Sequence, residues 1–212
     1  MAYNGIIIFG EMGSGKDTLA DQIIEQDQRI KKYGLGDIIR LIKKVTLVDP
    51  VWFGDERTFM QLAADKLREI DLDILNHFAL AKMLEENLSE ISLSKDHYRE
   101  DLDGLFHKIR QESNTIPMIV GGRTWKDYEY WTSRGFLDVG ILVDAHKRID
   151  RLTVRDGDEI AQKSNSAHNT EKDVRDIIDQ CAVKVDNNGS LEDLKQEAAR
   201  VVSLFEAKET LE

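Results

Sequence analysis

The sequence is poor in the residues that mark secreted, fibrous or membrane proteins. Its 212 residues include only one cysteine, Cys181, and two prolines. An internal disulfide is therefore impossible, and we expect this thiol to be a small buried group of a cytoplasmic protein. No apolar run approaches the roughly 20 residues of a membrane span, and the run at residues 6–9 is too short for a signal peptide.

Basic residues are also scarce, because 29 lysines and arginines face 40 aspartates and glutamates. The resulting net charge of -11 argues against the broad electrostatic attraction by which proteins bind polymeric nucleic acid. We expect no nucleic-acid polymer and no membrane among its partners. Any anion that binds this chain must meet local positive charge.

Apolar runs and helical periodicity alternate along the chain. Residues 6–9 form a continuous apolar run that stops at a glycine, which is typical of a strand buried on both faces. Further strands are predicted at residues 29–35, 116–120, 137–143 and 182–185, with helical patterns between them. This alternation predicts one α/β domain, with a five-stranded parallel sheet covered by helices on both sides.

A long helical segment, residues 36–113, separates the second and third predicted strands. Two apolar stripes at helical spacing are interpreted as core packing and not as ligand contacts: Phe59, Met60, Ala63, Ala64 and Leu67, then Leu72, Leu75, Phe78, Ala79 and Met83. Residues 85–103 are polar, which favours a solvated helix face or a variable loop. After residues 186–189, Ser190 can cap a final amphipathic helix.

The sequence GEMGSGK at residues 10–16 lies between a predicted strand and a predicted helix. In this context the pattern G-x-x-x-x-G-K wraps a polyphosphate with backbone N–H groups, and the lysine, here Lys16, lies near the β and γ phosphates. Asp17 stands where the pattern usually has a hydroxyl residue, and Thr18 follows it. Asp17 can bind Mg²⁺ directly or through water, or it can act as a helix-terminal carboxylate. The motif predicts an ATP- or GTP-binding phosphotransferase.

A group of arginines is expected near the phosphates. Arg148, Arg151 and Arg155 are spaced by three and four residues, so one helix face presents all three guanidinium groups and could close over the phosphates. Without the phosphate-binding loop, the same triplet would be interpreted as a solvated basic face.

Asp37, Arg40 and Lys44 share a helix face directly after the second predicted strand, where α/β proteins bind ligands. We assign Arg40 to the phosphate of an acceptor. Asp37 has three open roles: it could hold a magnesium-bound water, act as general base for a hydroxyl acceptor, or form a helix N-cap.

The segment G-E-M-G-S-G-K-D-T at residues 10–18, followed by Leu19 and Ala20, resembles the P-loop of deoxynucleoside monophosphate kinases of the bacteriophage and bacterial type. Residues 36–40 resemble the segment after the second strand in these kinases and in dephospho-CoA kinases. Further along, residues 59–71 resemble the helical substrate-binding region, residues 148–157 the lid, and residues 186–194 the adenine-side loop and last helix. One departure is that Gly121 and Gly122 precede Arg123, where the family usually has an acidic residue, so a carboxylate at that point is missing.

The resemblance implies a P-loop NTPase fold with three α/β/α layers. The core would comprise residues 1–35, 114–147 and 171–212, the helical acceptor-binding insertion residues 36–113, and the lid residues 148–170. The implied ATP-binding residues are Gly10, Met12, Gly13, Ser14, Gly15, Lys16, Asp17, Thr18, Asn188 and Gly189. The implied acceptor-binding residues are Asp37, Arg40, Arg68 and Arg123, and the implied catalytic residues are Lys16, Asp37, Arg148, Arg151 and Arg155, with Asp17 on the metal.

The alternative for Arg68 is surface pairing with Glu69 or Asp71, and for Arg123 it is pairing with Asp127. The resemblance implies transfer of the γ-phosphoryl group of ATP, with Mg²⁺, to a (deoxy)nucleoside monophosphate by a monomer or homodimer. Two alternatives remain open. One is a kinase of another small acceptor such as dephospho-CoA, and the other is a regulatory protein that binds a nucleotide without turnover.

Overall fold

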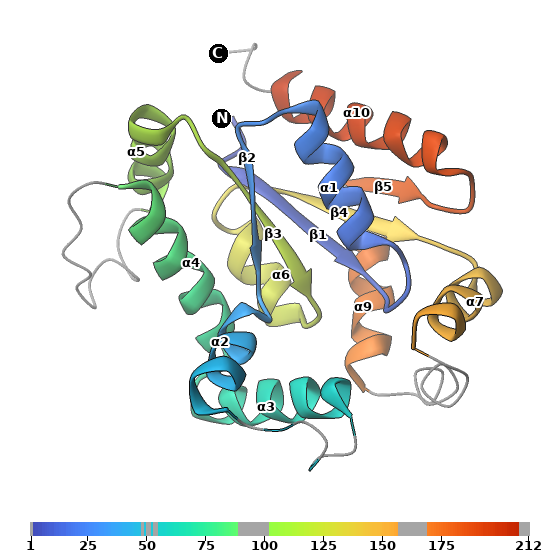
Figure 1. Cartoon of the computed structure of the whole chain (residues 1–212). Helices are drawn as coiled ribbons and strands as arrows, with labels where there is room; N and C mark the ends of the chain where they lie inside the picture. Colours follow the sequence, from blue (N-terminus) through green and yellow to red (C-terminus); the bar gives the residue numbers. More distant parts are fainter. Residues whose placement is uncertain are drawn as a thin grey trace.

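The computed structural model describes residues 2–47, 49, 52, 55–88, 102–156 and 169–207. Within them, five parallel strands form one sheet in the order β2-β3-β1-β4-β5 (Figure 1). The strands are β1 (Gly5–Gly10), β2 (Ile30–Gly34), β3 (Ile116–Gly122), β4 (Phe136–Leu142) and β5 (Val183–Asp186). All five predicted strands are thereby confirmed.

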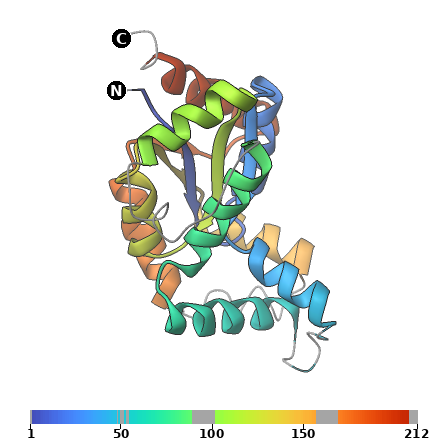
Figure 2. The same cartoon turned by 90° about the vertical axis from the view of Figure 1, so that its left-hand side faces the viewer.

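Helices cover both faces of the sheet, and others lie beyond the carboxyl ends of its strands. One face carries α1 (Lys16–Gln26) and α10 (Leu191–Ala207), and the other carries α4 (Ile74–Asn87), α5 (Leu102–Ser113), α6 (Trp125–Thr132) and α9 (Asn169–Gln180). Beyond the carboxyl ends of the strands lie α2 (Asp37–Thr46), α3 (Glu56–Ile70) and α7 (Ala145–Asp156) (Figures 1 and 2). The predicted three-layer arrangement is confirmed. In the described part of the chain, no helix is both long enough and apolar enough to cross a membrane.

The central strand β1 divides the core into two halves. Ile6 and Ile8 pack with the apolar faces of α1 and α10, whereas Ile7 and Phe9 pack with α4, α5, α6 and α9, and all four side chains are fully buried. This alternation follows from the two-residue period of a strand. β1 pairs in parallel with β3 on one side and β4 on the other, so the turn that follows it is anchored at the middle of the sheet.

The segment 36–113 is not one uniform insertion. Leu75, Ala79 and Met83 of α4 and Phe106 and Ile109 of α5 are buried in the core against the sheet. Among the described helices of this segment, α2 and α3 stand apart from the layers (Figure 2). The predicted polar stretch 85–103 includes the end of α4 and the start of α5, and residues 89–101 lie outside the described residues.

Cys181 provides a test of the core. Its thiol is 5% exposed, and burial, together with the charge of Asp138, raises its pKa to about 12. Because only the thiolate reacts, we expect iodoacetamide at pH 8 to label the native protein about 1,000-fold more slowly than the denatured chain. Mass spectrometry of this single cysteine measures both rates. Equal rates would show that the thiol is not buried as described.

Candidate functional site

The turn between β1 and α1 has the backbone geometry of a phosphate-binding loop. Gly13 and Gly15 have φ angles of +77° and +87°, a left-handed conformation that favours glycine. Gly15 is the N-cap of α1, so the free N–H groups of the first turn begin directly after it. These N–H groups and the positive end of the helix dipole favour a bound anion.

Two segments from the far end of the chain hold this loop. The side chain of Asn187, which follows β5, donates from Nδ2 to the carbonyl oxygen of Ser14 over 2.7 Å. Arg151 of α7 donates from Nη2 to the carbonyl oxygen of Asn187 over 3.0 Å. Its other terminal nitrogen, Nη1, is buried beside Gly15 without a hydrogen-bond partner among the described residues. A buried guanidinium nitrogen in this position fits an anionic ligand.

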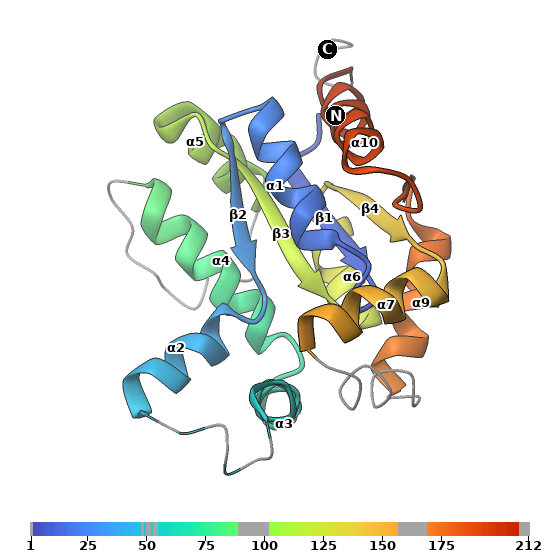
Figure 3. The ribbon, with the colours of Figure 1, turned by 45° about the vertical axis from the view of Figure 1, so that its right-hand side comes forward.

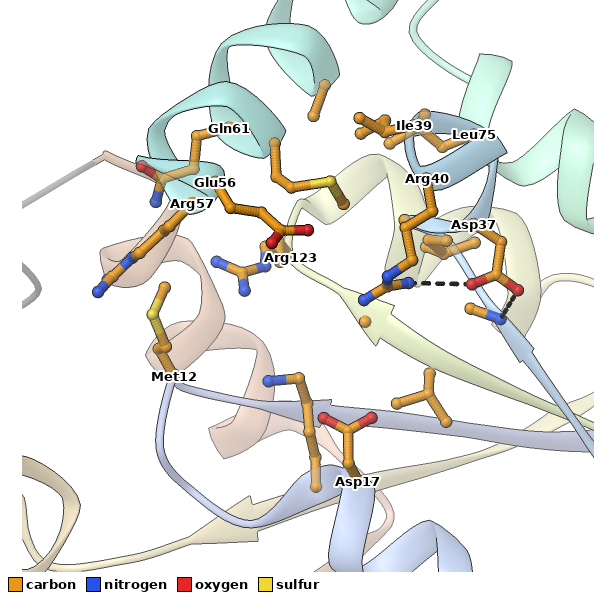
Figure 4. A pocket seen from close by; sticks show the side chains of 18 of the residues that line it. Met12, Asp17, Asp37, Ile39, Arg40, Glu56, Arg57, Gln61, Leu75 and Arg123 are labelled. Atoms are coloured by element: carbon orange, nitrogen blue, oxygen red, sulfur yellow. Dashed lines mark hydrogen bonds and ion pairs between the residues drawn. The ribbon is translucent and has the colours of Figure 1, made fainter. Parts of the chain in front are cut away.

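A cavity of about 780 Å³ opens at the carboxyl ends of the strands. It brings together eight residues that the sequence placed in the site: Met12, Gly13, Lys16, Asp17, Asp37, Arg40, Arg68 and Arg123. Its wall also holds basic Lys32 and Arg57 and acidic Asp55, Glu56 and Asp65. In Figure 4, Asp17 points into the cavity from the first turn of α1, and Arg40 and Glu56 enter from α2 and α3 on the opposite side. Cations therefore face the loop across one shared space.

Other predicted residues lie outside the lining of this cavity, namely Gly10, Ser14, Gly15, Thr18, Arg148, Arg151, Asn188 and Gly189. The side chain of Asn188 accepts from the N–H of Asp144 over 2.8 Å, so the residue that contacts the loop is its neighbour Asn187. Asn187 was not among the predicted site residues, although it lies in the Asp-Asn-Asn-Gly stretch that was noted in the sequence. The side chain of Arg155 and lid residues 157–168 lie outside the described residues.

Arg148 does not face an open phosphate site as the sequence suggested. Its side chain is 2% exposed, and Nη2 lies 3.8 Å from Oε1 of Glu11. Nη1 donates to the carbonyl oxygen of Met12 over 3.3 Å, and Leu152 of the same helix packs on Met12. The helical spacing was correct, but α7 lies beyond the carboxyl ends of the strands (Figure 3), and the face with Arg148 and Leu152 contacts the loop at Met12. Glu11, which also accepts from Arg175 of α9 over 2.7 Å, gave no signal in the sequence.

Asp37 is neutralised from two sides. Its Oδ1 accepts from Nη1 of Arg40 over 3.0 Å, and its Oδ2 accepts from Nζ of Lys82 over 3.1 Å and from the N–H of Gly34 over 3.2 Å. The N-cap of α2 is Gly36, so the predicted N-cap role of Asp37 is wrong. Lys44 does not line the cavity.

Arg68 and Arg123 meet at one carboxylate. Arg68 pairs with Asp127, with Nη2 and Oδ2 3.3 Å apart, and no pair with Glu69 or Asp71 is found in the described structure. The backbone N–H of Arg123 donates to the same Oδ2 over 2.9 Å. The sequence offered an ion pair between Arg123 and Asp127 as the alternative, whereas this hydrogen bond comes from the backbone N–H of Arg123.

The glycines before Arg123 are explained by their surroundings. Gly121 has a φ angle of +99°, and a Cβ atom on Gly122 would meet the ring of Phe9. An acidic side chain is therefore disfavoured at Gly121 by the backbone angle and at Gly122 by the ring of Phe9.

The stripe on α3 was interpreted only in part correctly. Phe59 is buried, and Ala64 and Leu67 pack against the core, as predicted, but Met60 and Ala64 also line the cavity. Arg57, Gln61 and Asp65 line it as well. The spacing of four residues among these three polar side chains was the signal that sequence analysis overlooked.

Among the described residues, no group of three or more His, Cys, Asp or Glu is placed to hold a metal ion. Mg²⁺ does not require such a group, because it is commonly held by one or two carboxylates together with substrate phosphates and water. Asp17 fits this role, since it lies in the first turn of α1 and lines the cavity beside Lys16.

Solved structures of other proteins share this architecture. No family model matches the chain, and no curated protein matches it at a significant level. Among solved structures, the chain is similar to TT1252 from Thermus thermophilus, with 20% identity over 94% of this chain and 97% of that chain and a TM-score of 0.54. It is also similar to shikimate kinases from Acinetobacter baumannii and Bacteroides thetaiotaomicron. Their identities are 13% and 14%, their TM-scores 0.51 and 0.50, and they cover 98% and 95% of this chain and 94% and 97% of their own.

The chain has the three-layer P-loop NTPase fold. At these identities the likeness concerns the fold alone, but it extends over nearly the whole length of each protein.

Two glycines allow the loop to be tested against a matched control. Gly15→Ala and Gly135→Ala both place alanine in the left-handed region, at φ angles of +87° and +74°, which costs about 1–2 kcal/mol of stability. Only the added methyl at Gly15 meets Asn187. We expect both variants to melt earlier, but only Gly15→Ala to lose about tenfold or more in affinity for Mg²⁺-ATP by calorimetry. Equal affinities would contradict the assignment of the loop.

Proposed function

We propose that this protein transfers the γ-phosphoryl group of ATP to the phosphate of a (deoxy)nucleoside monophosphate, giving ADP and a nucleoside diphosphate. The observation that carries this proposal is the single cavity that Lys16 of the loop shares with Arg40, Arg68 and Arg123. Transfer between two phosphates requires neutralisation of charge from several directions more than it requires covalent chemistry.

The donor end of the site is the loop. The N–H groups of the first turn of α1 would hold the triphosphate, and Lys16 would contact its β and γ groups. The unpartnered Nη1 of Arg151 beside Gly15 supports a phosphate contact there. Mg²⁺ held by Asp17 would neutralise charge on the β and γ phosphates. Asn188 and Gly189 are proposed for the adenine side.

The acceptor end is the wall formed by α2, α3 and the loop after β3. The contacts of Asp37 favour an acceptor that needs no general base, because both of its oxygens already accept from cations or a backbone N–H. A hydroxyl acceptor needs a proton acceptor, whereas a phosphate is already an anionic nucleophile. The wall therefore suits a phosphate-bearing acceptor, with Arg40, Arg68 and Arg123 binding its charge.

In the proposed reaction, an oxygen of the acceptor phosphate forms a bond to the γ-phosphorus of ATP. The bond from that phosphorus to the β–γ bridging oxygen breaks, and ADP leaves with the electron pair. The residues of this chain align the two phosphates and neutralise them. Closure of a lid at residues 148–170, with contributions from Arg151 and Arg155, would exclude water.

Lys16→Ala tests the donor site. Loss of an ammonium group that contacts phosphates should weaken ATP binding by about 10- to 100-fold, since a hydrogen bond to a charged group contributes about 1.5–3 kcal/mol. Lys31→Ala is the control, because Lys31 is an exposed lysine of β2 that pairs with Glu86. Calorimetry should detect weaker binding only in the Lys16 variant, and unchanged affinity there would contradict the proposal.

An ADP-release assay with the deoxynucleoside monophosphates and dephospho-CoA tests the acceptor. We expect at least one deoxynucleoside monophosphate to stimulate ADP release, with Mg²⁺ required. Stimulation by dephospho-CoA alone would replace the proposed acceptor by that alternative. Tight ATP binding without stimulation by any acceptor would support the regulatory alternative.

A further inference from the structure

The carboxylate of Asp127 joins three elements around the acceptor side of the cavity. Its Oδ2 accepts from the backbone N–H groups of Arg123 and Thr124, over 2.9 and 3.1 Å, and from Nη2 of Arg68 over 3.3 Å. Its Oδ1 accepts from Nδ2 of Asn76 over 3.2 Å. One side chain of α6 thus holds α3, α4 and the loop after β3.

This arrangement exceeds what a helix cap requires. Asp127 and Thr124 form a capping box at the start of α6, a motif in which the third helical residue is commonly Glu or Gln. A neutral side chain can therefore serve the cap. Asp127, in contrast, is charged and 0% exposed, and a buried charge is costly unless it is paired. Arg68 supplies the pairing, so the charge of Asp127 is explained by Arg68 and not by the cap.

The remaining contacts fix the direction of the carboxylate. Asn76 is itself fully buried, and its Oδ1 accepts from Nε1 of Trp131 over 2.9 Å. Because both oxygens of Asp127 are engaged, the carboxylate cannot rotate without breaking a hydrogen bond. Arg68 is consequently held in one direction, with its side chain 14% exposed at the wall of the cavity.

We propose that Asp127 is a positioning residue that sets Arg68 and Arg123 as a pair for the phosphate of the acceptor. A guanidinium group has five N–H donors, so Arg68 retains donors for a ligand while one of its terminal nitrogens contacts Asp127. The backbone contact fixes where the side chain of Arg123 begins, and both arginines line the same cavity. The inference rests on the proposed function and adds that affinity for the acceptor's phosphate depends on a buried residue that does not line the cavity.

The alternative is that Asp127 only stabilises the fold, and the variant Asp127→Asn separates the two. It retains an oxygen for the backbone N–H groups but removes the charge that holds Arg68. We expect the KM for the best monophosphate acceptor to rise about 10- to 100-fold, while the KM for ATP changes less than about twofold. Glu129→Gln, an exposed position two residues further along α6, should change neither constant.

The phosphate dependence provides a readout that a purely structural role would not alter. Calorimetry should show weaker binding of the monophosphate to Asp127→Asn, but unchanged binding of the corresponding nucleoside, which lacks the phosphate. Arg68→Gln should cause at least this loss, and adding Asp127→Asn to Arg68→Gln should cause less further loss than Asp127→Asn causes in the wild type, because part of the effect of Asp127 acts through Arg68. Equal losses for nucleoside and monophosphate, or fully additive losses, would overturn the inference.

If Asp127→Asn does not fold, as judged by thermal unfolding, Asn76→Ser serves in its place, because it releases Oδ1 of Asp127 and leaves the contacts of Oδ2 intact; it also removes the acceptor for Nε1 of Trp131, so its own thermal unfolding is measured first. A smaller rise in the KM for the acceptor, with the KM for ATP unchanged, would support the inference, and no rise would overturn it. If these variants turn over substrate with an unchanged KM for the acceptor, the positioning role of Asp127 is overturned and the proposed function still stands. Failure of the wild-type protein to bind or phosphorylate any monophosphate overturns the proposed function together with it.

Discussion

The tight turn from β1 into α1 fixes where every other part of the site must lie. β1 is hydrogen-bonded to β3 and β4 and buried on both faces, so the turn cannot shift without disturbing the core. Two left-handed glycines let the backbone approach a ligand closely. Asn187 and Arg151 then join this turn to the end of β5 and to α7. The loop is thus a junction of three chain segments as well as a binding element.

The cavity of this acidic protein is lined by six basic and five acidic side chains, and two of its arginines pair with buried or half-buried carboxylates. Arg40 pairs with Asp37, and Arg68 pairs with Asp127. Such pairing lowers the penalty for removing a charge from water and restricts the motion of a long side chain. Each guanidinium group keeps further N–H donors for a ligand. Cationic side chains with further N–H donors can therefore gather at one cavity of a protein whose net charge is -11.

The helices between β2 and β3 differ in how many of their residues are buried. α4 has seven buried residues, whereas α2 buries only Ile39 and α3 only Phe59. Elements with few buried apolar contacts open at lower free energy than the core does. Because α2 and α3 supply much of the wall of the cavity, the surface that would meet an acceptor lies on two helices with few buried residues.

The sequence by itself determined the five strands, the loop between β1 and α1, and the burial of Cys181. Those features depend on local periodicity, on glycines at fixed spacing and on apolar runs, all of which are visible within a few neighbouring residues. Tertiary structure alone decided that Arg148 of α7 packs onto the loop, that Met60 faces the cavity, and that Asp127 holds Arg68. The contact between Arg68 and Asp127 spans 59 positions, and that between Ser14 and Asn187 spans 173. Such contacts depend on how whole elements pack together, because a helical period specifies which residues share a face but not what that face meets.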